Sequence, residues 1–278
     1  MSDLKEISKL IYRLSSLIPN LGFSQTVIYL IQRLRCLLLN KTENYTLLSK
    51  NSQFPLICRP KTSDISVFTQ IFIEREYSCL DDLSNVDLII DCGANVGYSS
   101  AYFLSRFPKS KVICVEPDSS NFKLLEKNLA PYKERVKLIR SGLWSHTTGL
   151  KILETPYRDG REWTVQVREC KPGEEAEMQA TDVGTLLKES GLDRISILKI
   201  DIEGAEAVVF AHNYEYWLQY VDNMVIELHD DSFFGKASDI VLNTINSGRS
   251  FNISQSGELT VCKSYTTLPA TMNDKNLG

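Results

Sequence analysis

A glycine-rich turn directly after an apolar run is the first feature of this sequence that could bind a ligand. The run Leu88 to Ile90 leads into Asp91-Cys-Gly-Ala-Asn-Val-Gly97. Glycine lets backbone amides approach a ligand closely, and open α/β sheets bind ligands at the carboxyl ends of their strands. About 20 residues later a second run ends at Glu116-Pro117, where an acid can accept hydrogen bonds from both hydroxyls of a ribose. Together the two segments indicate a nucleoside site.

The details of the turn distinguish between two nucleoside cofactors. A nicotinamide dinucleotide usually requires G-x-G-x-x-G, in which a helix N-terminus faces the pyrophosphate. Here Asp91 precedes the first glycine by two residues, and Asn95 replaces the second glycine. This pattern suits a ligand with an amino-acid end and no phosphate, such as S-adenosylmethionine. Asp91 can hold the ammonium group of that ligand directly or through water, although an acid and glycines can also form a tight turn without a ligand.

A third segment, Ser141-Gly142-Leu143, ends the next predicted strand and would lie beside the adenine. Gly142 would permit close approach, and Leu143 could cover a face of the ring. The residues predicted to bind the cofactor are Asp91, Gly93, Ala94, Asn95, Gly97, Tyr98, Glu116, Pro117, Ser141, Gly142, Leu143 and Asp201.

Charged residues gather at the end of another buried run, near residue 200. In a strand, Leu198 and Ile200 would share one face, because side chains alternate between the two faces. Lys199, Asp201 and Glu203 would then share the other face. Asp201 is expected to face the cleft, whereas Glu203 could equally serve as an acid that stabilises the start of the next helix.

Two further candidates for catalysis follow the fifth predicted strand. Glu227 and His229 alternate onto one face of that strand, and the ordinary histidine pKa of about 6.5 suits a base. The predicted catalytic residues are therefore Asp201, Glu227 and His229, although His229 could instead order a loop. The same three side chains could ligate a hard divalent ion. No spacing demands a metal, and none is predicted.

Arginine and aromatic residues in the segment from 150 to 180 could contact a substrate. Arg158 and Arg161 lie close in sequence to Trp163. Arginine pairs bidentately with carboxylates, and an aromatic ring beside it could bind an apolar or peptidic body. We predict that these three residues bind the acceptor, with a solvated surface loop as the alternative.

Short apolar runs alternate with amphipathic helices through the middle of the chain, which predicts a parallel sheet with helices on both faces. A closing hairpin follows, which is the usual end of a Rossmann-like class I methyltransferase core. The predicted strands are Val86–Asp91, Lys111–Glu116, Val136–Ile139, Ile195–Asp201, Asn223–Leu228, Phe251–Ser254 and Leu259–Cys262, and the predicted helices are Val96–Phe107, Ser119–Ala130, Ala205–Tyr220 and Ser238–Ile245.

The flanking segments complete the predicted domain organisation. Residues 1–60 are expected to form a helical cap that closes over the cleft, with a second helix capped by Ser24; a membrane-surface or dimerisation helix is the alternative. Residues 61–264 form the core, in which 150–180 is an insertion with strands at Lys151–Leu153 and Trp163–Val167. Residues 265–278 are expected to be a disordered tail or a linker.

Composition excludes several classes of protein. The net charge of −4 argues against a nucleic-acid surface. The seven cysteines are odd in number and form no CxxC pair, so neither a disulfide framework nor a zinc site is expected. The apolar stretch Val27–Leu39 is shorter than the roughly 20 residues needed to span a bilayer. No secretory signal is recognisable, so a cytoplasmic protein is expected. The oligomeric state is left open.

From about Val67 to Cys262 the sequence resembles the FkbM family of methyltransferases. The matching segments are Asp91–Gly97, Glu116-Pro117, Thr181-Asp182-Val183 and Leu198-Lys-Ile-Asp-Ile-Glu-Gly-Ala-Glu206. The resemblance implies S-adenosylmethionine as methyl donor and O-methylation of a hydroxyl or carboxyl group on a small-molecule or modified-peptide natural product. A nicotinamide-dependent oxidoreductase and a non-catalytic cofactor-binding partner protein are the alternatives.

Overall fold

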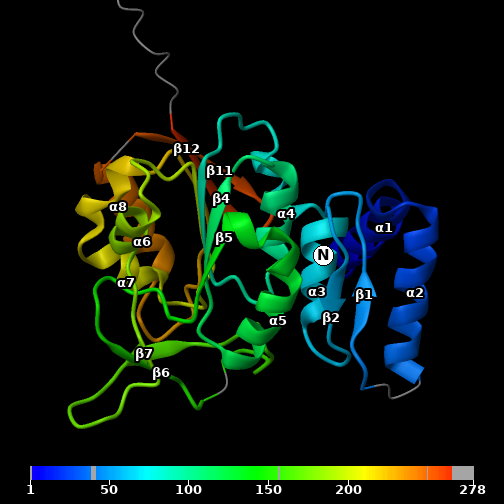
Figure 1. Ribbon diagram of the computed structural model, residues 1–278, viewed down its shortest axis with the longest axis horizontal. Coiled ribbons are helices and arrows are strands. Elements are labelled where there is room, and N and C mark those ends of the chain that lie inside the picture. The colour runs from blue at the N-terminus through cyan, green and yellow to red at the C-terminus, as the bar shows by residue number, and fades with distance from the viewer. Residues whose placement is uncertain (1, 39–41, 156, 249, 265–278) are drawn as a thin grey trace, which may run out of the picture.

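The computed structural model describes residues 2–38, 42–155, 157–248 and 250–264. The predicted tail, residues 265–278, lies outside the described residues. A parallel sheet flanked by helices forms the centre of the molecule, and a helical hairpin lies at one side (Figure 1).

In the described part of the chain, seven strands form the central sheet in the order β11-β12-β10-β9-β3-β4-β5. The five strands from β10 to β5 are parallel, and β12 runs antiparallel to both β10 and β11. This order confirms the predicted Rossmann-like fold with a C-terminal antiparallel hairpin. The strands are β3 (Leu88–Cys92), β4 (Lys111–Val115), β5 (Val136–Ile139), β9 (Ile197–Ile200), β10 (Asn223–Glu227), β11 (Phe251–Ser256) and β12 (Leu259–Ser264).

Helices cover both faces of this sheet, so its central strands are apolar on both sides. Ile89 of β3 packs with α4 and α5 on one face, whereas Leu88 and Ile90 pack with α6, α7 and α8 on the other. Figure 1 shows the two layers on opposite sides of the strands. The helices are α4 (Tyr98–Arg106), α5 (Ser119–Leu129), α6 (Val183–Ser190), α7 (Glu206–Ala211) and α8 (Ala237–Gly248).

Two predicted helix boundaries were wrong. The helix predicted over 205–220 ends at Ala211, because Asn213 adopts a left-handed conformation with φ 61°. Two 3-10 turns, Tyr214–Tyr216 and Leu218–Tyr220, continue the segment. At the N-terminus, α2 begins at Phe23, so Ser24 lies within its first turn and is not the N-cap.

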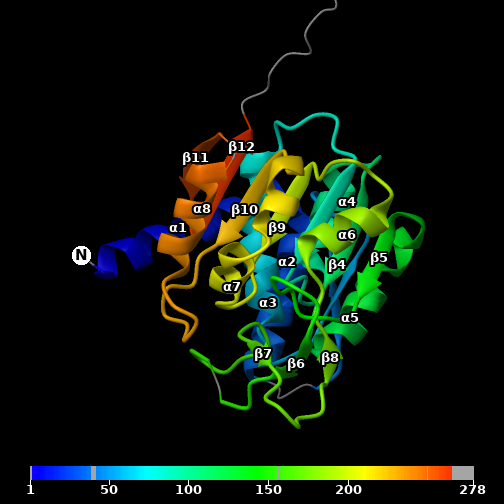
Figure 2. The same ribbon diagram turned by 90° about the vertical axis from the view of Figure 1, so that its left-hand side faces the viewer.

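The predicted insertion forms a small three-stranded antiparallel sheet at one end of the central sheet (Figure 2). It consists of β6 (Gly149–Ile152), β7 (Val167–Glu169) and β8 (Met178–Gln179). The strand predicted at Trp163–Val167 therefore begins later. Residues 161–164 form a turn instead, in which the amide of Thr164 donates to the carbonyl of Arg161.

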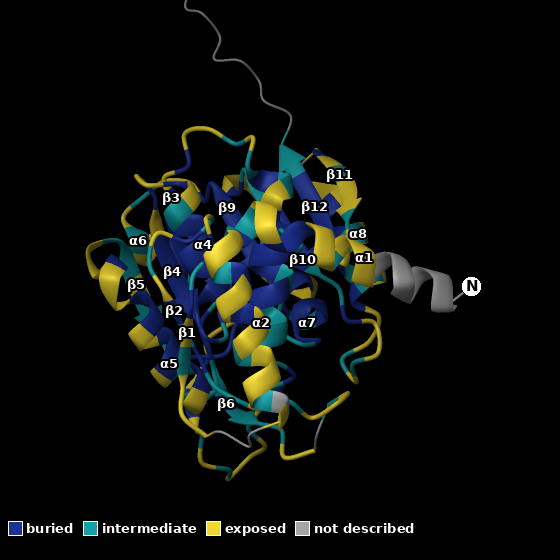
Figure 3. Ribbon diagram, turned by 90° about the vertical axis from the view of Figure 1, so that its right-hand side faces the viewer, coloured by how far each residue is buried: buried dark blue, intermediate teal, exposed yellow. Residues whose placement is uncertain are grey.

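The first two helices, α1 (Ser2–Leu21) and α2 (Phe23–Leu38), form a hairpin at the side of the core. Leu17, Leu21 and Tyr29 are buried in the main apolar cluster. Many large apolar side chains of the hairpin stay exposed, as the yellow segments of α2 in Figure 3 illustrate: Leu10, Ile11, Tyr12, Leu14, Ile18, Phe23, Val27, Ile28, Leu30, Ile31, Leu34 and Leu38. No helix in the described ranges is long and apolar enough to cross a membrane.

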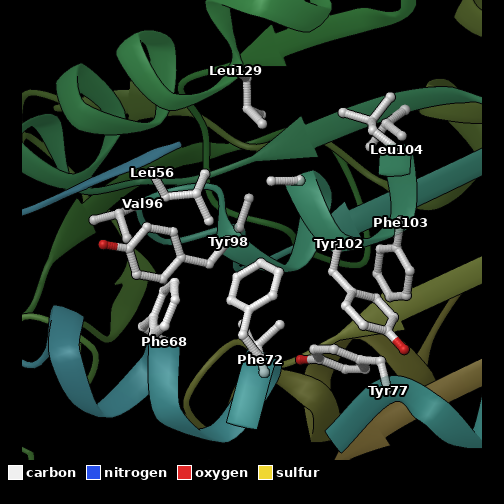
Figure 4. Packing of buried hydrophobic residues seen from close by; sticks show 14 of the residues in the cluster. Leu56, Phe68, Phe72, Tyr77, Val96, Tyr98, Tyr102, Phe103, Leu104 and Leu129 are labelled. Atoms are coloured by element: carbon white, nitrogen blue, oxygen red, sulfur yellow. The ribbon is translucent and has the colours of Figure 1, made fainter. Parts of the chain in front are cut away.

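Between this hairpin and the central sheet lies a segment that the sequence patterns did not resolve. A strand pair, β1 (Tyr45–Leu47) and β2 (Leu56–Cys58), leads to α3 (Asp64–Phe68), the π-helical turn η1 (Thr69–Ile73) and the 3-10 turn η2 (Glu76–Leu80). Phe68 and Phe72 pack against Tyr98 of α4, and Tyr77 packs against Tyr102 and Phe103 (Figure 4). Aromatic packing thus anchors this segment to the core.

The turns after β3 and β9 are in direct contact at Gly93. A Cβ atom added to Gly93 would lie 1.7 Å from the carbonyl oxygen of Asp201, and the residue has φ +77°. The glycine therefore lets one loop pack against the other, in addition to any ligand it could cradle.

We expect Gly93→Ala to lower the free energy of unfolding by at least about 3 kcal/mol, because backbone would have to move. Gly173→Ala is the matched control, since Gly173 has φ +85° and no atom within 4 Å of an added Cβ. It should cost only the left-handed strain of about 1–2 kcal/mol. Urea denaturation measures both, and equal losses would contradict the contact.

Candidate active site

A cavity of about 310 Å³ lies at the carboxyl ends of β3, β4, β9 and β10. This is the edge at which open parallel sheets bind ligands. Of the predicted site residues, those that line it are Ala94, Gly93, Asn95, Tyr98, Glu116, Pro117, Ser141, Gly142, Leu143, Arg158, Trp163, Asp201 and Glu227. Four predicted residues do not line it: Asp91, Gly97, Arg161 and His229.

The described residues of α1 and α2 are also absent from the cavity wall, so the expectation that this hairpin closes over the cleft was wrong. Residues of α3, η1 and η2 form that wall instead, among them Gln70, Glu76 and Tyr77. The hairpin packs against the outer side of η1, where the hydroxyl groups of Tyr29 and Thr69 are 2.8 Å apart.

Asp91 is fully buried beneath the turn and already has its own cation. Lys199 Nζ lies 3.3 Å from Asp91 Oδ1, and it donates hydrogen bonds to the carbonyl oxygens of Cys92 and Gly93 at 3.2 and 2.6 Å. The hydroxyls of Ser99 and Ser100 both donate to Asp91 Oδ2 at 2.6 Å. The expectation that Asp91 directly holds the cofactor's ammonium is therefore corrected: the ammonium group it contacts belongs to the protein.

Lys199 is charged even though it is buried. Burial lowers the pKa of Lys199, but the charges of Asp91 and Asp201 more than compensate, so the pKa lies above its ordinary value. Lys199 Nζ is 3.5 Å from Asp201 Oδ2. This one cation thus links the turn after β3 to the turn after β9.

Glu116 ends β4 with its carboxylate in the cavity wall. Its Oε2 accepts from the backbone amide of Asn95 at 2.8 Å, and its Oε1 accepts from that of Asp118 at 3.0 Å. Burial raises the pKa of Glu116 to about 7. Oε1 also accepts from the side-chain amide of Asn121 at 3.4 Å, so Oε2 is the oxygen that keeps capacity for a ribose hydroxyl.

Three other predicted residues differ in their surroundings. Asn95 Oδ1 is buried in the cavity wall without a hydrogen-bond partner, as expected for an atom that a ligand would satisfy. Gly142 is needed for the insertion, because an added Cβ would lie 2.6 Å from Leu150 Cδ1. Tyr98 belongs mainly to the aromatic core, and its hydroxyl donates to the carbonyl of Ile57 at 2.7 Å.

The acidic residues at the ends of β9 and β10 surround one histidine. Asp201, Glu203 and Glu227 are partly exposed to the cavity, whereas His229 is fully buried behind them. His229 Nε2 lies 3.4 Å from Glu227 Oε1, 3.5 Å from Glu203 Oε2 and 4.0 Å from Asp201 Oδ1. None of these contacts has the geometry of a hydrogen bond, and Nε2 has no partner.

These charges change the expected chemistry of His229. Burial lowers its pKa, but the hydrogen bond to Glu206 and the nearby negative charges of Glu227 and Asp201 outweigh burial and raise the pKa to about 11. The predicted role as a base of ordinary pKa therefore does not fit this environment, because an imidazolium cannot accept a proton. Among the predicted catalytic residues, Asp201 and Glu227 are the ones that face the cavity.

The cavity wall is strongly acidic. Among the described residues that line it, two side chains are basic, Arg158 and Lys199, and eight are acidic: Glu76, Glu116, Asp159, Glu162, Asp201, Glu203, Glu227 and Glu258. Burial and the nearby charges of Asp201 and Glu227 raise the pKa of Glu76 to about 8. The wall therefore favours ligands with positive charge.

The insertion is tied to the loop after β10. Arg158 forms two hydrogen bonds with Asp231, at 2.9 and 3.1 Å, and Tyr157 donates a third to the same carboxylate. Trp163 lines the cavity and donates to Asp159 at 3.2 Å, while the guanidinium of Arg161 stacks on the outer side of the Trp163 ring. Arg158 and Trp163 can thus reach an acceptor, but Arg161 is not placed to do so.

Sequence reasoning missed several residues of this site. Lys199 carried a signal, since a lysine in the middle of a buried strand needs a buried partner. Glu206 stands at the start of a helix, where an acid needs no further explanation, yet it is fully buried and bonds to His229 Nδ1 at 2.9 Å. Glu76 and Tyr77 come from a segment without clear periodicity and could not have been found from pattern alone.

Comparisons with known proteins agree with this geometry. The family described as "Methyltransferase FkbM domain" matches residues 91–252. Methyltransferase sdnD of Sordaria araneosa is 28% identical over 196 residues, which cover 60% of this chain and 75% of that protein. The AMB antimetabolite synthetase AmbE of Pseudomonas aeruginosa is 27% identical over 199 residues, which cover 59% of this chain but 9% of the synthetase.

Two solved structures share the general architecture at low similarity. TrmK of M. capricolum in complex with S-adenosyl-homocysteine aligns with TM-score 0.39 and 10% identity, covering 68% of this chain and 67% of that chain. Aeropyrum pernix fibrillarin with bound S-adenosyl-L-methionine aligns with TM-score 0.38 and 9% identity, covering 68% and 73%. Such scores add no argument of their own, so the assignment rests on the strand order and on the family match over more than half of the residues. The chain belongs to the FkbM methyltransferase family.

Proposed function

We propose that this protein transfers a methyl group from S-adenosylmethionine to a hydroxyl oxygen of a small molecule or modified peptide. The acidic cavity wall is the observation that carries the proposal. S-adenosylmethionine brings a sulfonium and an ammonium group and no phosphate, so a wall with eight acidic and two basic side chains suits it, and a bound cation in turn favours the ionised form of those acids. A nicotinamide dinucleotide carries a pyrophosphate, which the same wall would repel.

The residues of the wall divide into two groups along the cavity. Glu116 is placed to accept hydrogen bonds from the ribose, and Ser141 to Leu143 lie where the adenine is expected. The unpartnered Asn95 Oδ1 is available to a donor of the same ligand. The methionine end would then lie toward Asp201, at the ends of β9 and β10.

An uncharged hydroxyl is the acceptor that this wall favours. A carboxylate acceptor would bring another negative charge beside Asp201, Glu203 and Glu227, whereas a hydroxyl can donate a hydrogen bond to one of them. As the new oxygen–carbon bond forms, the hydroxyl proton passes to Asp201 or Glu227, and the electron pair of the broken carbon–sulfur bond remains on sulfur. Correct orientation of the two reactants can contribute about 7–11 kcal/mol to such a step.

The relatives support specialised metabolism as the setting. AmbE is named as an antimetabolite synthetase, and sdnD of Sordaria araneosa is named as a methyltransferase. A small-molecule or modified-peptide acceptor fits a role in making an antimetabolite.

We expect calorimetry to detect binding of S-adenosylmethionine and S-adenosylhomocysteine but not of NAD⁺. Glu116→Gln should weaken the binding of both nucleosides by about ten- to a hundredfold, because hydrogen bonds to a charged acceptor contribute about 1.5–3 kcal/mol. Glu126→Gln, on the exposed face of α5, is the control and should bind normally. Binding of NAD⁺ in preference to both nucleosides would overturn the proposal.

Transfer itself can be followed with S-adenosylmethionine that carries a carbon-13 methyl group, incubated with a panel of hydroxylated small molecules and peptides. We expect the chemical shift of the product's methyl group to identify an O-methyl ether. Asp201→Asn should lower turnover by about a hundredfold or more, since a positioned base contributes about 10²–10⁴. Asp239→Asn on the exposed surface of α8 should not. A label found on carbon or nitrogen would refute O-methylation.

A further inference from the structure

The unpartnered nitrogen of His229 points to a site that methyl transfer alone does not explain. His229 Nδ1 lies 2.9 Å from Glu206 Oε1, and Glu206 is fully buried. The same Oε1 accepts from the backbone amide of Ile202 at 3.0 Å, which holds the carboxylate in place. Since a carboxylate only accepts, Nδ1 carries its proton toward Glu206. Nε2 is thereby directed toward the cavity acids.

Nε2 faces carboxylate oxygens on every side that the described residues provide. Its neighbours are Glu227 Oε1, Glu203 Oε2 and Asp201 Oδ1, at 3.4 to 4.0 Å. Glu203 Oε2 is itself buried and has no hydrogen-bond partner. Three carboxylates around one buried, unpartnered nitrogen favour a positive charge at the centre of this arrangement, which either a proton on Nε2 or a bound cation can supply.

The protein's own basic groups in the cavity wall do not supply that charge. Lys199 is shared between Asp91 and Asp201 and donates to two backbone carbonyls. Arg158 forms its ion pair with Asp231, outside the cluster. Besides a proton on His229 itself, a bound cation can therefore supply this charge.

The ligand atoms are already gathered. One atom each from Asp201, Glu227 and His229 lie within 4.8 Å of one another. Asp201 and His229 follow the adjacent parallel strands β9 and β10, whose residues Ile200 and Ile226 are paired in register, and Glu227 ends β10. Rigid strands thus present two carboxylates and one imidazole from one side, and the cavity leaves the opposite side open.

We propose that Asp201, Glu227 and His229 bind one divalent cation. Glu206 orients His229 from behind, as carboxylates commonly do for metal-binding histidines. A mixed set of carboxylate and imidazole ligands suits Mn²⁺ better than Ca²⁺ or Mg²⁺, which prefer all-oxygen sites. The spacing of these residues in the sequence did not demand a metal; their juxtaposition in space favours one.

An ion at this position would have coordination sites directed into the cavity. A hydroxyl oxygen of the acceptor could fill one of them, and the ion would stabilise that oxygen as its proton passes to a carboxylate oxygen of Asp201 or Glu227 that is not bound to the ion. This chemical role rests on the proposed function, whereas binding of the ion does not. The two can therefore be tested separately.

The test uses the full chain, treated with EDTA, dialysed and titrated with Mn²⁺ while the electron paramagnetic resonance signal of free Mn²⁺ is recorded. We expect one Mn²⁺ per chain. Asp201→Asn and Glu227→Gln keep the shape of their side chains and should each raise the dissociation constant at least tenfold. Glu258→Gln removes another acid of the same cavity, outside the cluster, and should weaken Mn²⁺ binding far less than either of these changes.

Two controls separate the possible outcomes. Circular dichroism and thermal unfolding of each variant report whether it is folded, and S-adenosylmethionine calorimetry on the wild type reports whether the nucleoside site is intact. Folded wild-type protein that binds the nucleoside but not Mn²⁺ would refute the metal site and leave the proposed function standing. Equal Mn²⁺ affinity in wild type, Asp201→Asn and Glu227→Gln would refute it as well. Mn²⁺ binding without nucleoside binding would support the metal site and count against the proposed function.

Discussion

The buried ammonium group of Lys199 is the interaction on which the site depends. It lies between Asp91, which is buried below the turn after β3, and Asp201, which follows β9. It also donates to the carbonyl oxygens of Cys92 and Gly93, where β3 leads into its turn. Removing a charge from water is costly unless it is paired and hydrogen-bonded, so each member of this group requires the others. The cofactor turn and the acidic cluster consequently belong to one rigid unit at the edge of the sheet.

The central fold could be predicted because its strands are buried on both faces. Runs such as Leu88 to Ile90 are continuous and apolar, and they are followed by glycine or acidic residues that end them. Prediction was wrong where periodicity is ambiguous. Trp217 and Leu218 are buried where two 3-10 turns meet and not in a continuous helix, although their positions in the sequence fit both structures. A left-handed residue such as Asn213 is not visible in an apolar pattern.

The site was predictable in its outline but not in its charge balance. The glycine turn and Glu116 indicated a nucleoside at the correct edge of the sheet, because strand ends in a parallel sheet converge there. The protonation of His229 depends on carboxylates contributed by two different strand ends and by the start of α7. Glu76 enters the same cavity from η2, more than a hundred residues earlier in the chain. These charges come together only in the folded protein, so their combined effect on His229 could not be predicted from the sequence.

The ion pair between Arg158 and Asp231 is a weak attachment of the insertion to the loop after β10. Both side chains are largely exposed to solvent, and such surface ion pairs contribute at most about 1 kcal/mol. At room temperature that difference corresponds to roughly a fivefold preference for the tied form. Breaking this ion pair alone therefore costs little free energy. The hydrogen bonds of Glu162 with Ser63 and of Gln166 with Glu203 still hold the rest of the insertion against the core, so movement at this point is confined to the loop around Arg158.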